Sequence, residues 1–181
     1  MMHKDAIVNE IDRIVQASLV EFVEDVFRSF WNGREREAVS LYVLGYLQKQ
    51  CGEDKLLREP TQIGIEAAVP SSPKLNSKGR VCKDLVLWRE PKMTCWNERW
   101  EAVNPPLSIM EWKVFRLPSS KAQVYPQDVA WLKSYATLFP SMFVGHPFVG
   151  YAVALDLLQR NFRLSVTRVE SGEAWDKWLE L

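Results

Sequence analysis

Two charged residues, Glu111 and Lys113, interrupt an otherwise apolar run at residues 107–115. Side chains of a β-strand alternate between its faces, so this run as a strand places both residues on one face. A buried charge is costly unless it is paired or bound to a metal. The pair is therefore either a strand-face salt bridge or part of a hydrolytic site. In such a site Glu111 binds a divalent cation and Lys113 orients water or stabilises developing negative charge.

An E-x-K triplet alone is too common to indicate a site, so a site requires further carboxylates. Candidates precede this run in the chain. Asp84 is followed at once by four apolar residues, so it lies at the mouth of a second buried strand. An Asp there could instead satisfy neighbouring backbone amides. Glu37 lies one turn before Leu41 and two before Leu44 on a predicted helix, which predicts that it shares their stripe. It could equally complement the helix dipole, and Glu35 is predicted to point toward solvent.

Apolar periodicity indicates which elements position these residues. We expect helices over residues 6–31, 34–49, 126–136 and 174–179, the last carrying Trp175 and Trp178. We expect strands over residues 62–69, 80–88, 107–115 and 147–158, an edge strand over 162–170, and an extended segment opening at 143–145. A loop is expected at 70–79, and an excursion at 89–106 either buries Trp96 and Trp100 or presents them to a substrate or partner.

Composition narrows the functional class. The chain has 181 residues, enough for one domain with a sizeable core, and its formal net charge is zero. The chain has no overall positive charge that would indicate nucleic-acid binding. A small basic cluster is formed by Lys74, Lys78, Arg80 and Lys83. Three cysteines without metal-ligand spacing, and only two histidines, argue against a zinc site or a disulfide framework. We expect a cytoplasmic protein without a membrane segment.

At this point the sequence resembles the PD-(D/E)XK nuclease superfamily, which has the restriction-endonuclease-like fold. The resemblance covers roughly residues 35–158 and depends on three short motifs. They are Arg34-Glu35-Arg36-Glu37, Lys83-Asp84-Leu85-Val86-Leu87 and Ile109-Met110-Glu111-Trp112-Lys113. The chain departs from the family pattern in two ways. Lys83 stands where the family name has proline, and a long insertion separates Asp84 from Glu111.

The resemblance implies a specific set of site residues. Asp84 and Glu111 would hold Mg²⁺ or Mn²⁺, with the backbone carbonyl of Trp112 as a further ligand. Lys113 would position or polarise the attacking water, and Glu37 would complete the shell directly or through water. Oxygen ligands of this kind suit magnesium or manganese better than zinc. The metal would activate water for in-line attack on a phosphodiester.

We therefore expect a single α/β domain of the restriction-endonuclease-like fold, with a central mixed sheet of about five strands flanked by helices. An N-terminal helix occupies residues 1–33, the nuclease-like core residues 34–158, and a C-terminal strand and short helix residues 159–181. The expected function is Mg²⁺-dependent hydrolysis of nucleic acid, with DNA as the favoured partner. The alternatives are an inactive domain of the same fold that binds protein or nucleic acid, and a homodimer built through the N-terminal helix. Fold alone does not decide among them.

Overall fold

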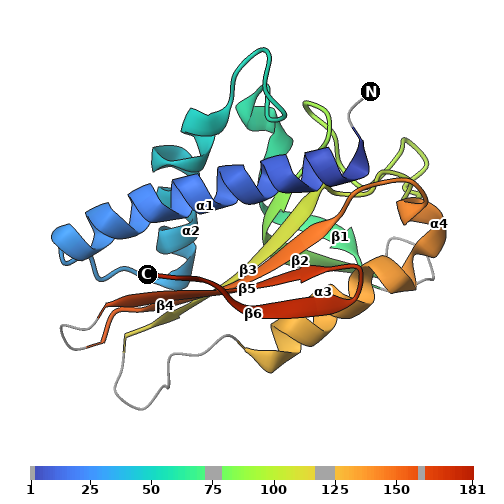
Figure 1. Cartoon of the computed structure of the whole chain (residues 1–181). Coiled ribbons are helices and arrows are strands. Elements are labelled where there is room, and N and C mark those ends of the chain that lie inside the picture. The colour runs from blue at the N-terminus through green and yellow to red at the C-terminus, as the bar shows by residue number, and fades with distance from the viewer. Residues whose placement is uncertain (1–2, 72–78, 117–124, 159–161) are drawn as a thin grey trace.

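The protein folds as a three-layer α/β/α sandwich, seen here in a computed structural model that describes residues 3–71, 79–116, 125–158 and 162–181 (Figure 1). Helices α1 (Lys4–Arg28) and α2 (Glu35–Gly45) cover one face of the sheet, and α3 (Pro126–Leu138) and α4 (Pro140–Phe143) cover the other. Each face has its own hydrophobic cluster, one under α1 and α2 and one under α3. No helix in these described ranges combines the length and hydropathy needed to cross a bilayer.

The sheet contains six strands in chain order, where about five were expected. They are β1 (Ile63–Pro70), β2 (Arg80–Leu87), β3 (Ser108–Phe115), β4 (Val149–Asp156), β5 (Arg163–Glu170) and β6 (Glu173–Glu180). Neighbours pair antiparallel except β3 and β4, which pair parallel through a crossover that contains α3. Short 3₁₀ turns, η1 (Leu47–Gln50) and η2 (Pro60–Gln62), follow α2 and precede β1. Against β4, α3 approaches so closely that a Cβ at Gly150 would lie 2.9 Å from Leu132.

The apolar face of helix α1 packs against the core. Its buried residues recur every three or four positions, from Ile7 to Val26, and pack toward the sheet. From the sequence, this helix could serve either core packing or the seam of a homodimer, and its apolar face packs in the core. A polar contact also fixes its position, because Asp12 accepts hydrogen bonds from Arg168 Nε at 2.8 Å and from the Tyr151 hydroxyl at 2.6 Å.

Strand β2 changes face at Asp84, and this break shapes the site. Val81 packs on the α3 face, whereas Leu85, four positions later, packs on the α1 face. A regular strand would keep both on one face. Lys83 consequently shares the α3 side with Val81, and the Asp84 carboxylate turns toward β3, where it meets the backbone N–H of Trp112. The local break therefore puts two consecutive charged residues next to the central strand.

The neighbouring strand β1 breaks at the same level. Ile63 packs with the α1-face cluster and Ala67 with the α3-face cluster, and Glu66 between them has φ 50°. Residues other than glycine rarely adopt this left-handed backbone conformation. The register pairs that flank Glu66 and Asp84 remain regular, so the two breaks lie side by side.

The C-terminal segment corrects two expectations. Residues 174–179 belong to strand β6 and not to a helix, and β5 is consequently an internal strand and not the edge. Trp175 and Trp178, which the expected helix was to carry, flank a bulge in β6 at which Lys177 has φ 55°. The Ser171-Gly172 turn, with both φ positive, was the hairpin signal that sequence reasoning missed.

The segment after α3 corrects a third expectation. Residues 143–145 do not begin an extended segment, because α4 ends at Phe143 and a turn with Gly145 at φ 71° follows. The excursion at 89–106 forms one short bridge, between Trp96 and Ala102. Trp96 is half-buried there, whereas Trp100 is 59% exposed. The loop expected at 70–79 lies mostly outside the described residues.

Candidate active site

The most enclosed charges of the site are those of Glu111 on β3 and Lys83 on β2. Lys83 Nζ forms an ion pair with Glu111 Oε1, and both side chains are buried, with 9% and 8% of their surface exposed. Apart from this ammonium, Oε1 has no hydrogen-bond donor in the described part of the chain. Trp131 of α3 closes the pair from above, with its ring centroid 3.5 Å from Lys83 Nζ. The partner of Glu111 is therefore Lys83 and not Lys113.

The Glu111 carboxyl group is held in an unfavourable environment for its charge. Its pKa is raised from 4.5 to about 7: burial is the largest cause, Lys83 opposes it, and the carboxylates of Asp84 and Asp128 add to it. Burial therefore outweighs the single ammonium beside it. A group of this kind in contact with several titratable neighbours is a candidate for function.

Asp84 lies between β2 and β3 where their pairing ends. The last register pair of the two strands is Leu85 with Met110, and beyond it Asp84 Oδ2 accepts a hydrogen bond from Trp112 N at 2.7 Å. The carboxylate thus replaces a missing backbone acceptor, which is the structural role that its position at a strand start suggested. Its half-buried position also leaves it next to Glu111 and Lys113.

Lys113 connects β3 to the helices on both sides of the sheet. Its Nζ donates to the carbonyl of Trp112 at 2.8 Å and lies 3.4 Å from Glu35 Oε1 and 3.9 Å from Asp128 Oδ2. Glu35 begins α2 and Asp128 lies in the first turn of α3. One ammonium therefore draws together two acids from opposite layers.

The acid that α2 brings to the cluster is Glu35, and the structure does not place the predicted Glu37 there. Glu37 shares a stripe with Leu41 and Leu44, but that stripe faces solvent, with Leu44 65% exposed. Its carboxylate accepts the backbone N–H of Arg34 at 2.6 Å and so closes the start of the helix. Glu35 lies one and two turns before Val39 and Tyr42, which are buried, so it faces the site.

Asp84 acts on the other acids through its charge. Burial is the first cause that raises the pKa of both Glu35 and Asp128, and the carboxylate of Asp84 raises each of them further. Lys113 lowers both. Together with Glu111, four acids meet two ammonium groups, which leaves two formal negative charges when all are ionised.

A small hollow opens beside Asp84. It has a volume of 80 Å³ and lies between α2 and the paired strands β1 and β2, lined by Glu35, Arg36, Val39, Ile65, Glu66 and Asp84. Arg36 and Glu66 form an ion pair at its rim, with 3.2 Å between Nε and Oε1. Two of the clustered acids, Glu35 and Asp84, are therefore open to small molecules from this side.

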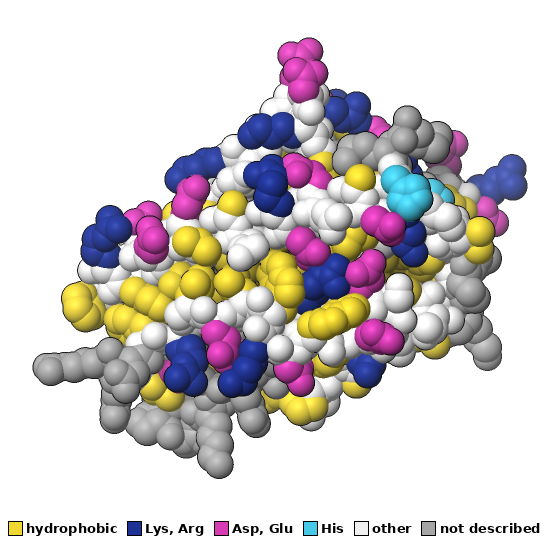
Figure 2. Space-filling view, viewed as in Figure 1, with side chains coloured by type: hydrophobic (Ala, Val, Ile, Leu, Met, Phe, Trp, Pro, Cys, Tyr) yellow, Lys and Arg dark blue, Asp and Glu magenta, His cyan; other side chains and the backbone are white. Residues whose placement is uncertain are grey.

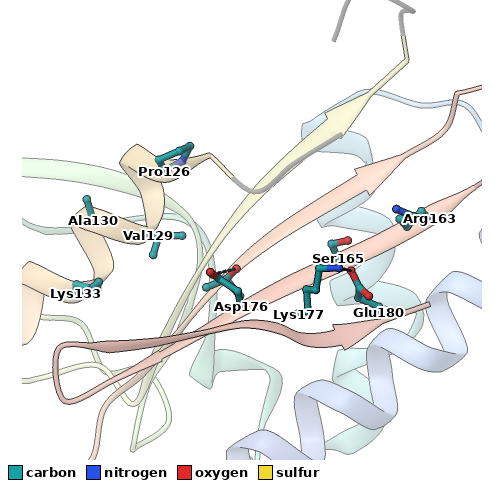
Figure 3. A pocket seen from close by; sticks show the side chains of 10 residues that line it. Pro126, Val129, Ala130, Lys133, Arg163, Ser165, Asp176, Lys177 and Glu180 are labelled. Atoms are coloured by element: carbon teal, nitrogen blue, oxygen red, sulfur yellow. Dashed lines mark hydrogen bonds and ion pairs between the residues drawn. The ribbon is translucent and has the colours of Figure 1, made fainter. Parts of the chain in front are cut away.

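A larger hollow, of 620 Å³, lies elsewhere, between α3 and strands β5 and β6 (Figure 3). It opens on a different face of α3 from the one that carries Asp128 and Trp131. The residues that line it do not include Glu35, Asp84, Glu111 or Lys113; of its charged groups, Lys177 lies 3.4 Å from Glu180 and Asp176 accepts a hydrogen bond from Thr167 at 3.1 Å. We therefore assign the chemistry to the acidic cluster and not to this larger space.

The predicted metal ligands fit a divalent cation in chemical type, since all are carboxylate or carbonyl oxygens. The two excess negative charges of the cluster would also be balanced by a divalent cation. The arrangement is not a ready coordination shell, however. Among the described residues, no three acidic, histidine or cysteine side chains are placed to hold one ion. The Glu111 carboxylate is already paired with Lys83, and the Trp112 carbonyl already accepts a hydrogen bond from Lys113.

Besides Glu35, two residues of the cluster were not predicted. Asp128 was visible as an acid in the first turn of a helix entered through Pro126, but nothing in the chain indicated that this turn faces β3. Lys83 was assigned to a solvated basic cluster, whereas it is buried. Of the other members of that cluster, Arg80 is exposed, and Lys74 and Lys78 lie outside the described residues. The comparisons with protein-family models, curated proteins and solved structures find no match for this chain.

Proposed function

We propose that the protein is a divalent-metal-dependent nuclease of the PD-(D/E)XK type that hydrolyses DNA phosphodiester bonds. One observation carries the proposal: Glu35, Asp84, Glu111 and Lys113 come from three different elements and meet in one cluster with excess negative charge. The order helix, three strands, helix, strand, along which the sequence resembles the superfamily, also supports it. The three cysteines are free thiols, in keeping with a cytoplasmic location.

Each residue has a distinct task in this proposal. Asp84, Glu111 and the Trp112 carbonyl would hold Mg²⁺ or Mn²⁺, which supplies an activated water and offsets charge on the phosphate. Lys113 points its ammonium at the same carbonyl and stabilises the negative charge that develops on the phosphate. Glu35 holds that ammonium from α2, which is the position that the resemblance gave to Glu37.

The surface sets a condition on the substrate. On the face drawn in Figure 2, acidic and basic side chains are interspersed, in keeping with the formal net charge of zero. Affinity for a nucleic acid therefore cannot come from a general basic field and must come from local contacts near the cluster. We expect weak binding in the absence of metal and a shallow dependence of binding on salt, because few phosphates are contacted.

A second candidate, an inactive domain of the same fold that binds protein or nucleic acid, is favoured by one specific contact. The ion pair of Glu111 with Lys83 is enclosed, and a purely structural pair would have this form. The cleavage experiment below separates the two candidates.

The test is cleavage of plasmid and single-stranded DNA with Mg²⁺ or Mn²⁺. Asp84→Asn and Lys113→Met should each lower the rate at least about a hundredfold, because each removes a charge that acts on the transition state. The matched controls are Asp54→Asn and Lys4→Met, which change exposed residues away from the cluster. Equal rates in the site variants and the controls would refute the proposal, and binding without cleavage by the wild type would favour the second candidate.

A further inference from the structure

Lys83 has an unusual position for a lysine that neighbours a proposed metal ligand. It comes immediately before Asp84, and the break in β2 directs its side chain to the α3 side, where Glu111 lies. Its Nζ contacts the carboxylate on one side and the face of the Trp131 ring on the other. The ammonium therefore already holds one of the two carboxylate oxygens that a cation bound to Glu111 could use.

The burial of this pair shows what the ammonium contributes. Removing two charges from water costs several kcal/mol for each ion, and removing only one partner leaves the other uncompensated. Glu111 has no other donor at Oε1 within the described residues, so Lys83 is what allows its charge to remain inside the protein.

Lys113 does not have this position. It is bonded to the Trp112 carbonyl and to Glu35, and 29% of its side chain is exposed. The Trp112 carbonyl has two lone pairs and can accept from Lys113 beside a metal ion, whereas the ammonium of Lys83 is paired with the charge of Glu111 itself.

We infer that Lys83 is an internal cation that competes with the divalent metal for Glu111 and thereby sets the metal affinity of the site. This inference depends on the proposed function, because it assumes that Glu111 is a metal ligand. Metal binding then requires the ammonium to leave the carboxylate. The flexible stem of lysine permits this movement, and Trp131 offers the displaced ammonium a cation–π contact that it already makes.

The exchange also has an electrostatic consequence. A monovalent ammonium is replaced by a divalent ion, so the cluster moves closer to neutrality in the metal-bound protein. The remaining acids are close by, since Asp84 is bonded to the N–H of Trp112 next to Glu111 and Asp128 lies 3.9 Å from Lys113 on the same strand. They favour the ion of higher charge, which is why a metal can displace the lysine at all.

The test is titration of the full chain with MnCl₂ in the absence of nucleic acid, by calorimetry and by the electron paramagnetic resonance signal of free Mn²⁺. Lys83→Met keeps the length of the side chain and removes its charge. We expect it to bind Mn²⁺ at least about tenfold more tightly than the wild type, because the competitor is gone. Lys83→Arg keeps the charge and should bind no more tightly than the wild type.

A second set of variants allows for a folding defect. Lys83→Gln removes the charge but leaves a donor at Glu111, so it should also bind more tightly if Lys83→Met does not fold. The double variant Lys83→Met with Glu111→Gln has no buried charge at this position and should lose the gain in affinity. In thermal melts, Mn²⁺ should stabilise Lys83→Met more than the wild type.

The outcomes separate this inference from the proposed function. Wild-type binding of Mn²⁺ with equal or weaker binding by both charge-neutral variants would overturn the inference and leave the nuclease proposal standing. Binding by a charge-neutral variant but not by the wild type would support the inference and overturn the nuclease proposal for the natural chain. Binding by none of them would overturn both.

Discussion

Two groups of charges lie in different parts of the sheet, one on the α1 face and one around Asp84 with acids from both helical layers, and they differ in how well their charges are matched. In the first group, on the α1 face, Asp12 accepts a bifurcated hydrogen bond from Arg168 Nε, at 2.8 and 3.0 Å to its two oxygens, and one from the Tyr151 hydroxyl. Arg168 also contacts Glu170 at 2.8 Å and the ring of Trp175. Both the carboxylate and the guanidinium therefore have several partners each.

The second group, around Asp84, is matched much less completely. The buried Glu111 has a single ammonium as its partner, and its pKa rises to about 7 because burial outweighs that ammonium. The acids from α2 and α3 share one lysine, Lys113. We conclude that burial of charge does not itself indicate a site. An imbalance among buried charges does, because stability alone gives no reason to keep it.

The largest expected effect on stability comes from a change in the first group. Asp12→Ala should lower the free energy of unfolding by about 3 kcal/mol, because it leaves Arg168 and Tyr151 without their main acceptor. Urea unfolding followed by tryptophan fluorescence measures this, with Asp54→Ala, at an exposed turn, as the control. A loss below about 1 kcal/mol would show that the first group is not the structural one.

The pH dependence of stability tests the second group. Because the folded pKa of Glu111 is raised to about 7, its contribution to stability is fully present below pH 4.5 and is lost as the pH rises through 7. Between pH 5 and 8, metal-free wild type should lose on the order of 3 kcal/mol relative to Glu111→Gln, for a shift of this size. Parallel stability curves for the two proteins in EDTA would contradict the raised pKa.

The smallest effects distinguish the two acids of α2. Glu37→Ala should cost about 0.5–1 kcal/mol of stability, because it removes the contact that closes the start of the helix, and it should leave cleavage unchanged. Glu35→Ala should change stability less but lower the cleavage rate about tenfold, since Lys113 loses the partner that orients it. The opposite pattern would return Glu37 to the site.

The sequence predicted part of the cluster, and the reason is local. Glu111 and Lys113 are two positions apart on one strand, and Asp84 opens another, so alternation alone was enough to select them. It did not select Lys83 as the partner of Glu111, because a regular strand would have directed Lys83 to the face of Leu85. Only the break at Asp84, which depends on the packing of β1 and β2, reverses this.

By itself, then, the sequence determined the α/β class, the long amphipathic α1, most of the strands and three of the charged residues, since each follows from spacing within a single element. Tertiary structure decided which stripe of α2 is buried, and therefore that Glu35 and not Glu37 faces Lys113. It also brought Asp128 from α3 to the cluster and converted the last predicted helix into β6. These features depend on contacts between elements far apart in the chain, which no local periodicity encodes.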